Sequence, residues 1–151
     1  MNFRPLFSRS MELISVNSKL MIQEITDSDY PMLVEWWAAH QWPAIPKEAL
    51  PPLGYISWKG EKPILAGYVY FTLGSTMCWL EWIVGNPDST PEERGEALKE
   101  IVEKTDQVAR ENGYSMIFTA TKHKKLIERF KSNGFNVTEE EMTHLLKVLP
   151  P

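Results

Sequence analysis

The sequence predicts an α/β fold in which a mixed, mostly antiparallel sheet carries helices on both faces. Three observations support this prediction. Strand-like segments follow a short first helix, a long amphipathic helix with signals at both ends comes next, and a further strand–helix pair leads to the C-terminal segments. A meander followed by one strand–helix–strand crossover gives a mixed sheet. The expected order of elements is therefore β-α-β-β-β-α-β-α-β-β.

The first half of this order follows from local patterns. We expect a strand at residues 22–26 and a helix at residues 28–40, with Asp27 as its N-cap residue. Three segments rich in β-branched and aromatic residues come next, separated by turns that contain glycine. They predict a meander of strands at residues 54–58, 64–73 and 76–84.

The clearest helix signal lies between Thr90 and Gly113. Thr90 is an N-cap residue, Pro91 takes the first helical position, and Glu93 completes a capping box with Thr90. An apolar stripe at helical spacing continues to Ala109, and Gly113 ends the helix. Beyond it we expect a strand at residues 114–120, a helix at 122–133, and closing strands at 135–137 and 142–149.

Composition indicates one globular domain at residues 21–151. Of the 151 residues, 43% are hydrophobic and 24% are charged, and the net charge of −4 gives no general attraction to nucleic acid or to an anionic membrane. No apolar run reaches the roughly 20 residues of a membrane span. Cys78, the single cysteine, indicates a buried residue in a reducing compartment, so we expect a cytoplasmic protein. The three histidines are far apart, which predicts no metal site.

The order of elements resembles the GNAT superfamily of acyltransferases, over residues 21–149. That family has a strand, a phosphate-binding turn of the form Arg/Gln-x-x-Gly-x-Gly/Ala and a long helix. The matching residues here are 92–97, after a strand that ends at Val84. A Gly-Phe pair after the last helix also matches, at Gly134 and Phe135. The Trp-rich first helix and residues 50–54 look like small GNAT-like proteins encoded by bacteriophages.

The resemblance implies that acetyl-CoA binds where the strand ending at Val84 gives way to the long helix. Backbone N–H groups and the macrodipole at a helix N-terminus attract a pyrophosphate group. In the family pattern Arg or Gln stands where this chain has Glu92, and a helix that begins at Pro91 would contain Gly95. The residues implied to contact acetyl-CoA are Ile83, Val84, Arg94, Gly95, Glu96, Ala97 and Leu98.

Glu81 is the candidate general base. Strand alternation places it on one face with Met77, Trp79 and Ile83, and apolar surroundings raise the pKa of a carboxyl group. The resemblance implies the same role, because the family often has a glutamate on this strand to deprotonate the amine. A strand glutamate that points into solvent or pairs with a lysine remains an equal alternative.

His123 is the second candidate for a catalytic role. The family commonly has an asparagine at this position, and its usual tyrosine acid, towards the CoA thiolate, is replaced here by Phe130. Phe130 is expected to pack in the core, and His123 could assist the reaction. An exposed histidine that only contacts water at the start of a helix is the alternative for His123.

The resemblance also implies that the first helix and the residues after it line the acceptor side. The candidate substrate-binding residues are Trp37, His40, Trp42 and, on the central strand, Tyr70. Packing in the core is the alternative, and it is favoured for Trp36. Because Trp36 and Trp37 are adjacent, we expect one of them to line a pocket or an interface. An exposed tryptophan would favour a homodimer.

Two functions from different classes follow. The first is an N-acyltransferase that moves an acetyl group from acetyl-CoA to a primary amine of unknown identity, on a small molecule or a peptide, by direct attack. The second is a binding or structural protein that has kept the GNAT fold and lost the chemistry, which Glu92 and Phe130 support. Stabilisation by acetyl-CoA would discriminate between them.

We predict that residues 1–20 form an extension that the domain does not need for folding. Apolar periodicity begins only at Met21. Deleting the extension should leave the melting temperature almost unchanged in differential scanning calorimetry. A loss of several degrees would show that the segment packs against the domain.

Overall fold

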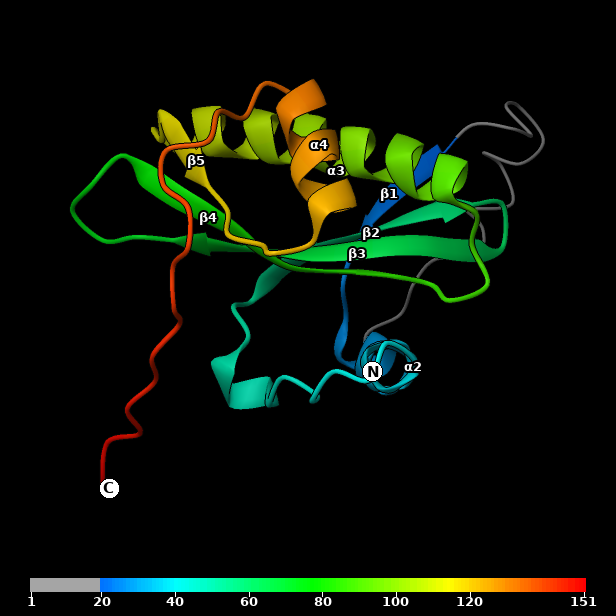
Figure 1. Ribbon diagram of the computed structural model, residues 1–151, viewed down its shortest axis with the longest axis horizontal. Helices are drawn as coiled ribbons and strands as arrows, with labels where there is room; N and C mark the ends of the chain where they lie inside the picture. The colour runs from blue at the N-terminus through cyan, green and yellow to red at the C-terminus, as the bar shows by residue number, and fades with distance from the viewer. Residues whose placement is uncertain (1–19) are drawn as a thin grey trace. The chain divides into compact units, whose positions relative to one another are not determined.

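A computed structural model describes residues 20–151 of the chain, so the expected extension lies outside the described residues except for Leu20. Leu20 already belongs to the first strand. The chain divides into two compact units, Met1–Ala120 and Thr121–Pro151, which are described separately. In the first unit, helix α2 covers one face of a twisted sheet and helix α3 covers the other (Figure 1).

Within the described residues, the sheet of the first unit has five strands, and their order across the sheet is their order in the sequence. Its first four strands pair antiparallel and the fifth pairs parallel to the fourth, which confirms the predicted mixed, mostly antiparallel sheet. Each predicted strand of this unit agrees with an observed one to within two residues at each end. The strands are β1 Leu20–Glu24, β2 Leu53–Lys59, β3 Lys62–Phe71, β4 Met77–Gly85 and β5 Met116–Phe118.

The first helical region is a short 3-10 helix, η1 Asp27–Asp29, followed by α2 Tyr30–Ala39. Its N-cap residue is Thr26 rather than Asp27, and the Thr26 N–H donates a hydrogen bond of 2.8 Å to Asp29 Oδ2. A second short 3-10 helix, η2 Lys47–Ala49, lies in the connection to β2.

Both adjacent tryptophans of α2 are buried, which corrects the expectation that one of them lines a pocket. Trp36 is 5% exposed and Trp37 is 2% exposed. The sheet residues Ile56 and Val84 belong to the same core cluster, and Trp42, Ile45 and Leu50 from the segment after α2 pack against it. The helix is therefore covered by more than the sheet alone, so two side chains that point in different directions can both be buried.

Helix α3, Pro91–Glu111, begins at the residue that the capping box predicts. Thr90 Oγ1 accepts the Glu93 N–H at 3.1 Å, and Glu93 Oε1 accepts the Thr90 N–H at 2.9 Å. The stripe facing the sheet is fully or almost fully buried: Ala97, Leu98, Ile101, Val102, Thr105 and Ala109. Thr105 fits this stripe because its hydroxyl donates to the Ile101 carbonyl at 2.7 Å.

The second unit contains α4 Lys124–Ser132 and the chain beyond it. Phe130 is buried, as predicted, and its ring centroid lies 4.9 Å from that of Phe135. The predicted closing strands at residues 135–137 and 142–149 are wrong for the single chain, in which this segment forms neither helix nor strand. A run rich in apolar residues does not by itself make a strand, because a strand is held by hydrogen bonds to a neighbour.

Candidate functional site

The pairing between β4 and β5 stops after three residues on each strand. Met77, Cys78 and Trp79 pair with Met116, Ile117 and Phe118, and the ladder ends there. If the ladder continued in the same register, Glu81 would lie opposite Ala120. The Ala120 N–H instead donates to the side chain of Glu81, with 3.0 Å between nitrogen and Oε1. From Leu80 onward, β5 thus no longer pairs with the backbone of β4.

A β-bulge at Trp82 changes the direction of the side chains that follow. Trp82 has φ 59°, a left-handed conformation that is rare for a bulky residue. Tyr68 pairs with Glu81 while Ala66 pairs with Val84, so Gly67 alone faces two residues of β4.

The bulge corrects the predicted orientation of Ile83. A Cβ atom on Gly67 would lie 2.6 Å from Ile83 Cδ1, 3.4 Å from Leu80 Cδ1 and 3.8 Å from Ile101 Cγ2 of α3. Ile83 therefore shares the α3 face with Leu80. Glu81 is directly opposite Tyr68, which belongs to the core cluster on the α2 face, so Glu81 lies on that other face.

Glu81 is partly buried at the point where the two strands separate. Burial raises the pKa of its carboxyl group to about 7, although the hydrogen bond from the Ala120 N–H lowers it in part. At neutral pH the group is therefore divided between its protonated and its ionised form. A carboxyl group of this kind can accept a proton from a weakly acidic donor and return it to water.

Tyr70 and Trp82 form a hydrogen-bonded chain on the same face as Glu81. Trp82 Nε1 donates to the Tyr70 hydroxyl at 2.6 Å, and that hydroxyl donates to the Ala49 carbonyl at 2.6 Å. Burial raises the pKa of Tyr70, the Trp82 hydrogen bond lowers it, and the charge of Glu81 raises it further. The Tyr70 hydroxyl is thus fixed in place and stays protonated at neutral pH.

His40 and Trp42 lie near the C-terminal end of β4. His40 Nε2 is 3.0 Å from the Gly85 carbonyl oxygen. A carbonyl oxygen can only accept a hydrogen bond, so in this contact Nε2 carries a proton and donates it. The His40 and Trp42 rings are stacked, with centroids 4.7 Å apart. Of the predicted substrate-binding residues, these two and Tyr70 are only partly buried, whereas Trp37 belongs to the core.

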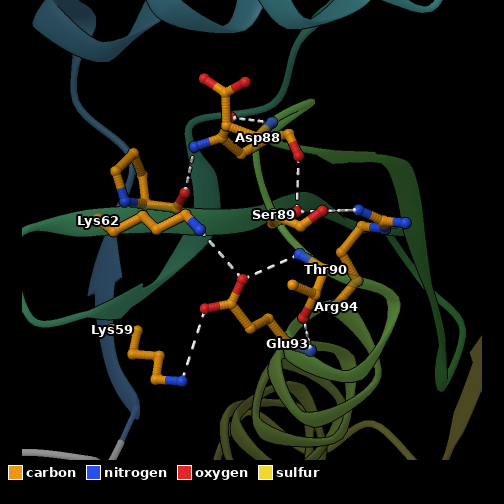
Figure 2. Close-up of polar contacts among 9 residues, drawn as sticks. Lys59, Lys62, Asp88, Ser89, Thr90, Glu93 and Arg94 are labelled. Atoms are coloured by element: carbon orange, nitrogen blue, oxygen red, sulfur yellow. Dashed lines mark hydrogen bonds and ion pairs between the residues drawn. The ribbon is translucent and has the colours of Figure 1, made fainter.

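The N-terminus of α3 is already occupied by a carboxylate of the chain itself. Figure 2 shows Glu93 between the Thr90 backbone and two lysines of the sheet. Glu93 Oε1 lies 3.1 Å from Lys62 Nζ, and Oε2 lies 3.5 Å from Lys59 Nζ. The Thr90 hydrogen bond, together with Lys62 and Lys59, lowers the pKa of Glu93 to about 2.

Residues 92–97, predicted to form a phosphate-binding turn, instead belong to helix α3. Arg94 Nη1 donates to the Ser89 carbonyl and also lies 3.1 Å from Ser89 Oγ (Figure 2). Gly95 is inside α3, as the capping box predicted, and Glu96 is exposed. Ala97 and Leu98 are fully buried in the core. The start of α3 therefore has no glycine turn. Arg94, the cation near it, already binds Ser89 in the preceding loop.

The structure brings together Glu81, Tyr70 and Trp82, of which sequence reasoning missed Trp82. It also missed Lys59 and Lys62, because their link to Glu93 joins positions about 30 residues apart. His123 is the exposed N-cap residue of α4 in the second unit, and its role beside Glu81 stays a prediction.

In the part of the chain that the structure describes, no cluster of three or more His, Cys, Asp or Glu residues is arranged to hold a metal ion. Every helix within residues 20–151 falls short of the length and apolar character needed to span a bilayer. A separate open cavity of about 500 Å³ lies away from Glu81 and is lined by Ile22, Glu24, Leu53, Tyr55, Lys104 and Val108.

Comparison with solved structures shows the fold of GNAT-type acetyltransferases. An aminoglycoside acetyltransferase from an uncultured soil metagenomic sample, in complex with trehalose, has a TM-score of 0.60 and 18% identity, covering 87% of this chain and 97% of that one. An acetyltransferase of Trypanosoma brucei gives 0.60 and 16%, covering 85% and 100%. A transcriptional regulator from Bacillus halodurans C-125 gives 0.64 and 16%, covering 85% and 100%. Neither the protein-family models nor the curated protein sequences give a match.

We predict that the charge of Glu81 lowers the stability of the folded state above neutral pH. Its pKa rises from 4.5 in the unfolded chain to about 7 in the folded one, so the folded state holds the proton more tightly. Stability should therefore fall as the pH rises from 4.5 to 7, by at most about 3 kcal/mol. In urea unfolding, Glu81→Gln should remove this fall, and the exposed Glu24→Gln should keep it.

Proposed function

We propose that the protein is an N-acyltransferase that moves an acetyl group from acetyl-CoA to a primary amine of unknown identity, with Glu81 as general base. The observation that carries this proposal is the position of Glu81. Its carboxyl group, with a pKa of about 7, lies beside the unpaired stretch of β4. An amine must lose a proton when it attacks an acyl group, and a base with a pKa near the working pH serves this step best.

In the proposed reaction the neutral amine attacks the carbonyl carbon of the thioester directly. A C–N bond forms, the C–S bond breaks with its electron pair on sulfur so that CoA leaves as the thiolate, and the proton of the amine passes to the Glu81 carboxylate. Backbone N–H groups of β4 near Val84 that have no strand partner would polarise the carbonyl oxygen. The fixed Tyr70 hydroxyl and the Trp82 ring would bound the acceptor side, because they share the face of Glu81.

The described residues offer a site for the amide-containing arm of acetyl-CoA but no ready site for its pyrophosphate. An extended arm with amide groups could hydrogen-bond to the backbone of β4 beyond Trp79, where β5 no longer pairs. The pyrophosphate end has no ready site at α3, because Glu93 accepts the Thr90 N–H and pairs with both lysines. Acetyl-CoA binding at this helix would therefore require Glu93 to move aside.

We predict that Glu81→Gln lowers the turnover rate by about 100-fold or more, the usual scale for loss of a general base. The test measures CoA release in a screen of primary amines and peptides, followed by steady-state kinetics with any acceptor found. The wild-type rate should rise with pH and level off above about 7, because only ionised Glu81 can accept a proton.

The glutamine variant should lose that acidic limb while its KM for acetyl-CoA changes little. Glu24→Gln, a matched change at an exposed position of β1, should leave both rate and profile as they are. If Glu81→Gln keeps the full rate and the limb, Glu81 only bridges the two strands and another group is the base.

A second candidate function is favoured by Glu93. A protein that has kept the GNAT fold for binding or structure needs no anion site at α3, and filling that site with its own carboxylate would stabilise the fold. Phe130 in place of the family's tyrosine acid agrees with this. The likeness of residues 50–54 and the Trp-rich first helix to bacteriophage-encoded GNAT-like proteins would make it a phage-associated protein.

We predict that Glu93→Gln tightens acetyl-CoA binding about tenfold in isothermal titration calorimetry, the factor that corresponds to about 1.4 kcal/mol of removed repulsion. A glutamine can still accept the Thr90 N–H, so the cap of α3 persists while Lys59 and Lys62 are released. Glu92→Gln is the matched control, because it changes the net charge equally at an exposed neighbouring position. If neither the wild type nor Glu93→Gln binds acetyl-CoA, the non-catalytic function is supported.

A further inference from the structure

Three aromatic residues form a row across β3, β4 and β5. Tyr70 pairs with Trp79, and Trp79 pairs with Phe118. Directly paired residues point to the same side of a sheet, so the three side chains lie in one line on one face. The ring centroids of Trp79 and Phe118 are 5.2 Å apart, and their planes are tilted by 37°. These three residues are called the aromatic row below.

The aromatic row lies beside Glu81 on the same face of the sheet. Trp79 and Glu81 are two residues apart on β4, and the pairing with β3 is regular between them, so both side chains point to the α2 face. Two residues of a strand span about 7 Å. A ligand with its polar end at the Glu81 carboxyl group therefore needs only a short chain to reach the aromatic row.

Helix α2 does not cover the aromatic row. Among the described residues, the core cluster under α2 includes Tyr68, the partner of Glu81, and further side chains pack against this cluster. None of the three residues of the aromatic row belongs to either group, and each is only partly buried. The row therefore keeps ring surface that a ligand can contact, next to a carboxyl group.

We propose that the aromatic row selects the acceptor of the acyl transfer, and that this acceptor is a small primary amine joined to an aromatic ring by a short carbon chain. This inference rests on the proposed function for its reaction, although binding of such an amine can be measured without it. The nitrogen lies at Glu81, and the ring packs on Trp79 and Phe118. Aromatic rings gain from contact with one another beyond the area that they bury.

The same surface disfavours a polar acceptor. An amine whose chain carries hydroxyl groups or a second ammonium group would lose water over these rings without regaining its hydrogen bonds. Tyr70 has the hydroxyl group of the row, and its proton is already donated to the Ala49 carbonyl. That hydroxyl also accepts from Trp82 Nε1, so both of its roles are in use. An aromatic ring makes no such demand.

The test compares 2-phenylethylamine with putrescine, a diamine that has no ring. Turnover is measured by CoA release, and the binding of each amine is measured by isothermal titration calorimetry with and without CoA. We expect kcat/KM for 2-phenylethylamine to exceed that for putrescine by about 100-fold, the scale on which an apolar site discriminates.

The variant Phe118→Leu keeps apolar bulk in the aromatic row and removes a flat ring. It should raise both KM and the dissociation constant for 2-phenylethylamine about tenfold, with kcat nearly unchanged, because the contact is the same before and during the reaction. Phe71→Leu is the matched control. Phe71 is an exposed ring of the same sheet that stacks on Tyr114, and strand alternation places it on the other face, so its loss should change neither value.

The two measurements separate this inference from the proposed function. Equal use of putrescine, or unchanged constants in Phe118→Leu, would overturn selection by the aromatic row and leave acyl transfer in place. If no amine is acetylated but 2-phenylethylamine binds, and Phe118→Leu weakens that binding, the row is supported as an aromatic amine site and only the proposed function is wrong. If 2-phenylethylamine does not bind to the wild type, the inference is wrong.

Discussion

The hydrogen bond from the Ala120 N–H to Glu81 lies where backbone pairing between β4 and β5 ends. A side chain here accepts the N–H that a backbone carbonyl would accept in a continued ladder. The two strands can therefore separate without leaving this donor unsatisfied in a partly buried place. Because Glu81 has this role, its carboxyl group is held beside the stretch of β4 that β5 does not pair, where the proposed reaction would take place.

The same interaction explains the unusual electrostatics of the site. The carboxyl group lies on the α2 face, which is packed with aromatic side chains, and it has a single backbone donor to offset its desolvation. One hydrogen bond is too little to hold the group fully ionised at neutral pH. Glu93 shows the opposite balance, because a backbone donor and two lysines keep it ionised down to a pH of about 2.

Sequence patterns could predict the elements whose signals are local. The capping box of Thr90 and Glu93 located the start of α3 to the residue, and it also indicated that Gly95 lies inside the helix. The meander was predicted to within two residues because turns and β-branched runs are local features as well. Glu81 could be selected as a candidate because a carboxylate in an apolar strand is a visible exception.

The features that sequence patterns missed depend on contacts between distant residues. The bulge at Trp82 has no glycine or proline to mark it, and its presence follows from the register with β3. It moved Ile83 to the α3 face, against the simple alternation. The ion pairs of Glu93 with Lys59 and Lys62 could not be read from the sequence either, because they bring the β2–β3 turn to the start of a helix. The prediction of the C-terminal strands was wrong for a related reason. A strand requires a hydrogen-bonded neighbour, and the sequence pattern does not identify one.

Glu81 and Glu93 also differ in what a bound acyl donor would require of them. Glu81 can stay in place, because a neighbouring amine needs only its unprotonated oxygen. Glu93 would have to give up the Thr90 N–H and both lysine contacts, and any ligand that displaced it would have to replace them. A pyrophosphate carries enough oxygen atoms to accept from all three donors, and its greater negative charge would strengthen both ionic contacts. The displaced carboxylate would then move into water, where the ionised form loses little. Exchange of one anion for another is therefore physically reasonable at this helix, and its free energy is a small difference between two similar sets of contacts.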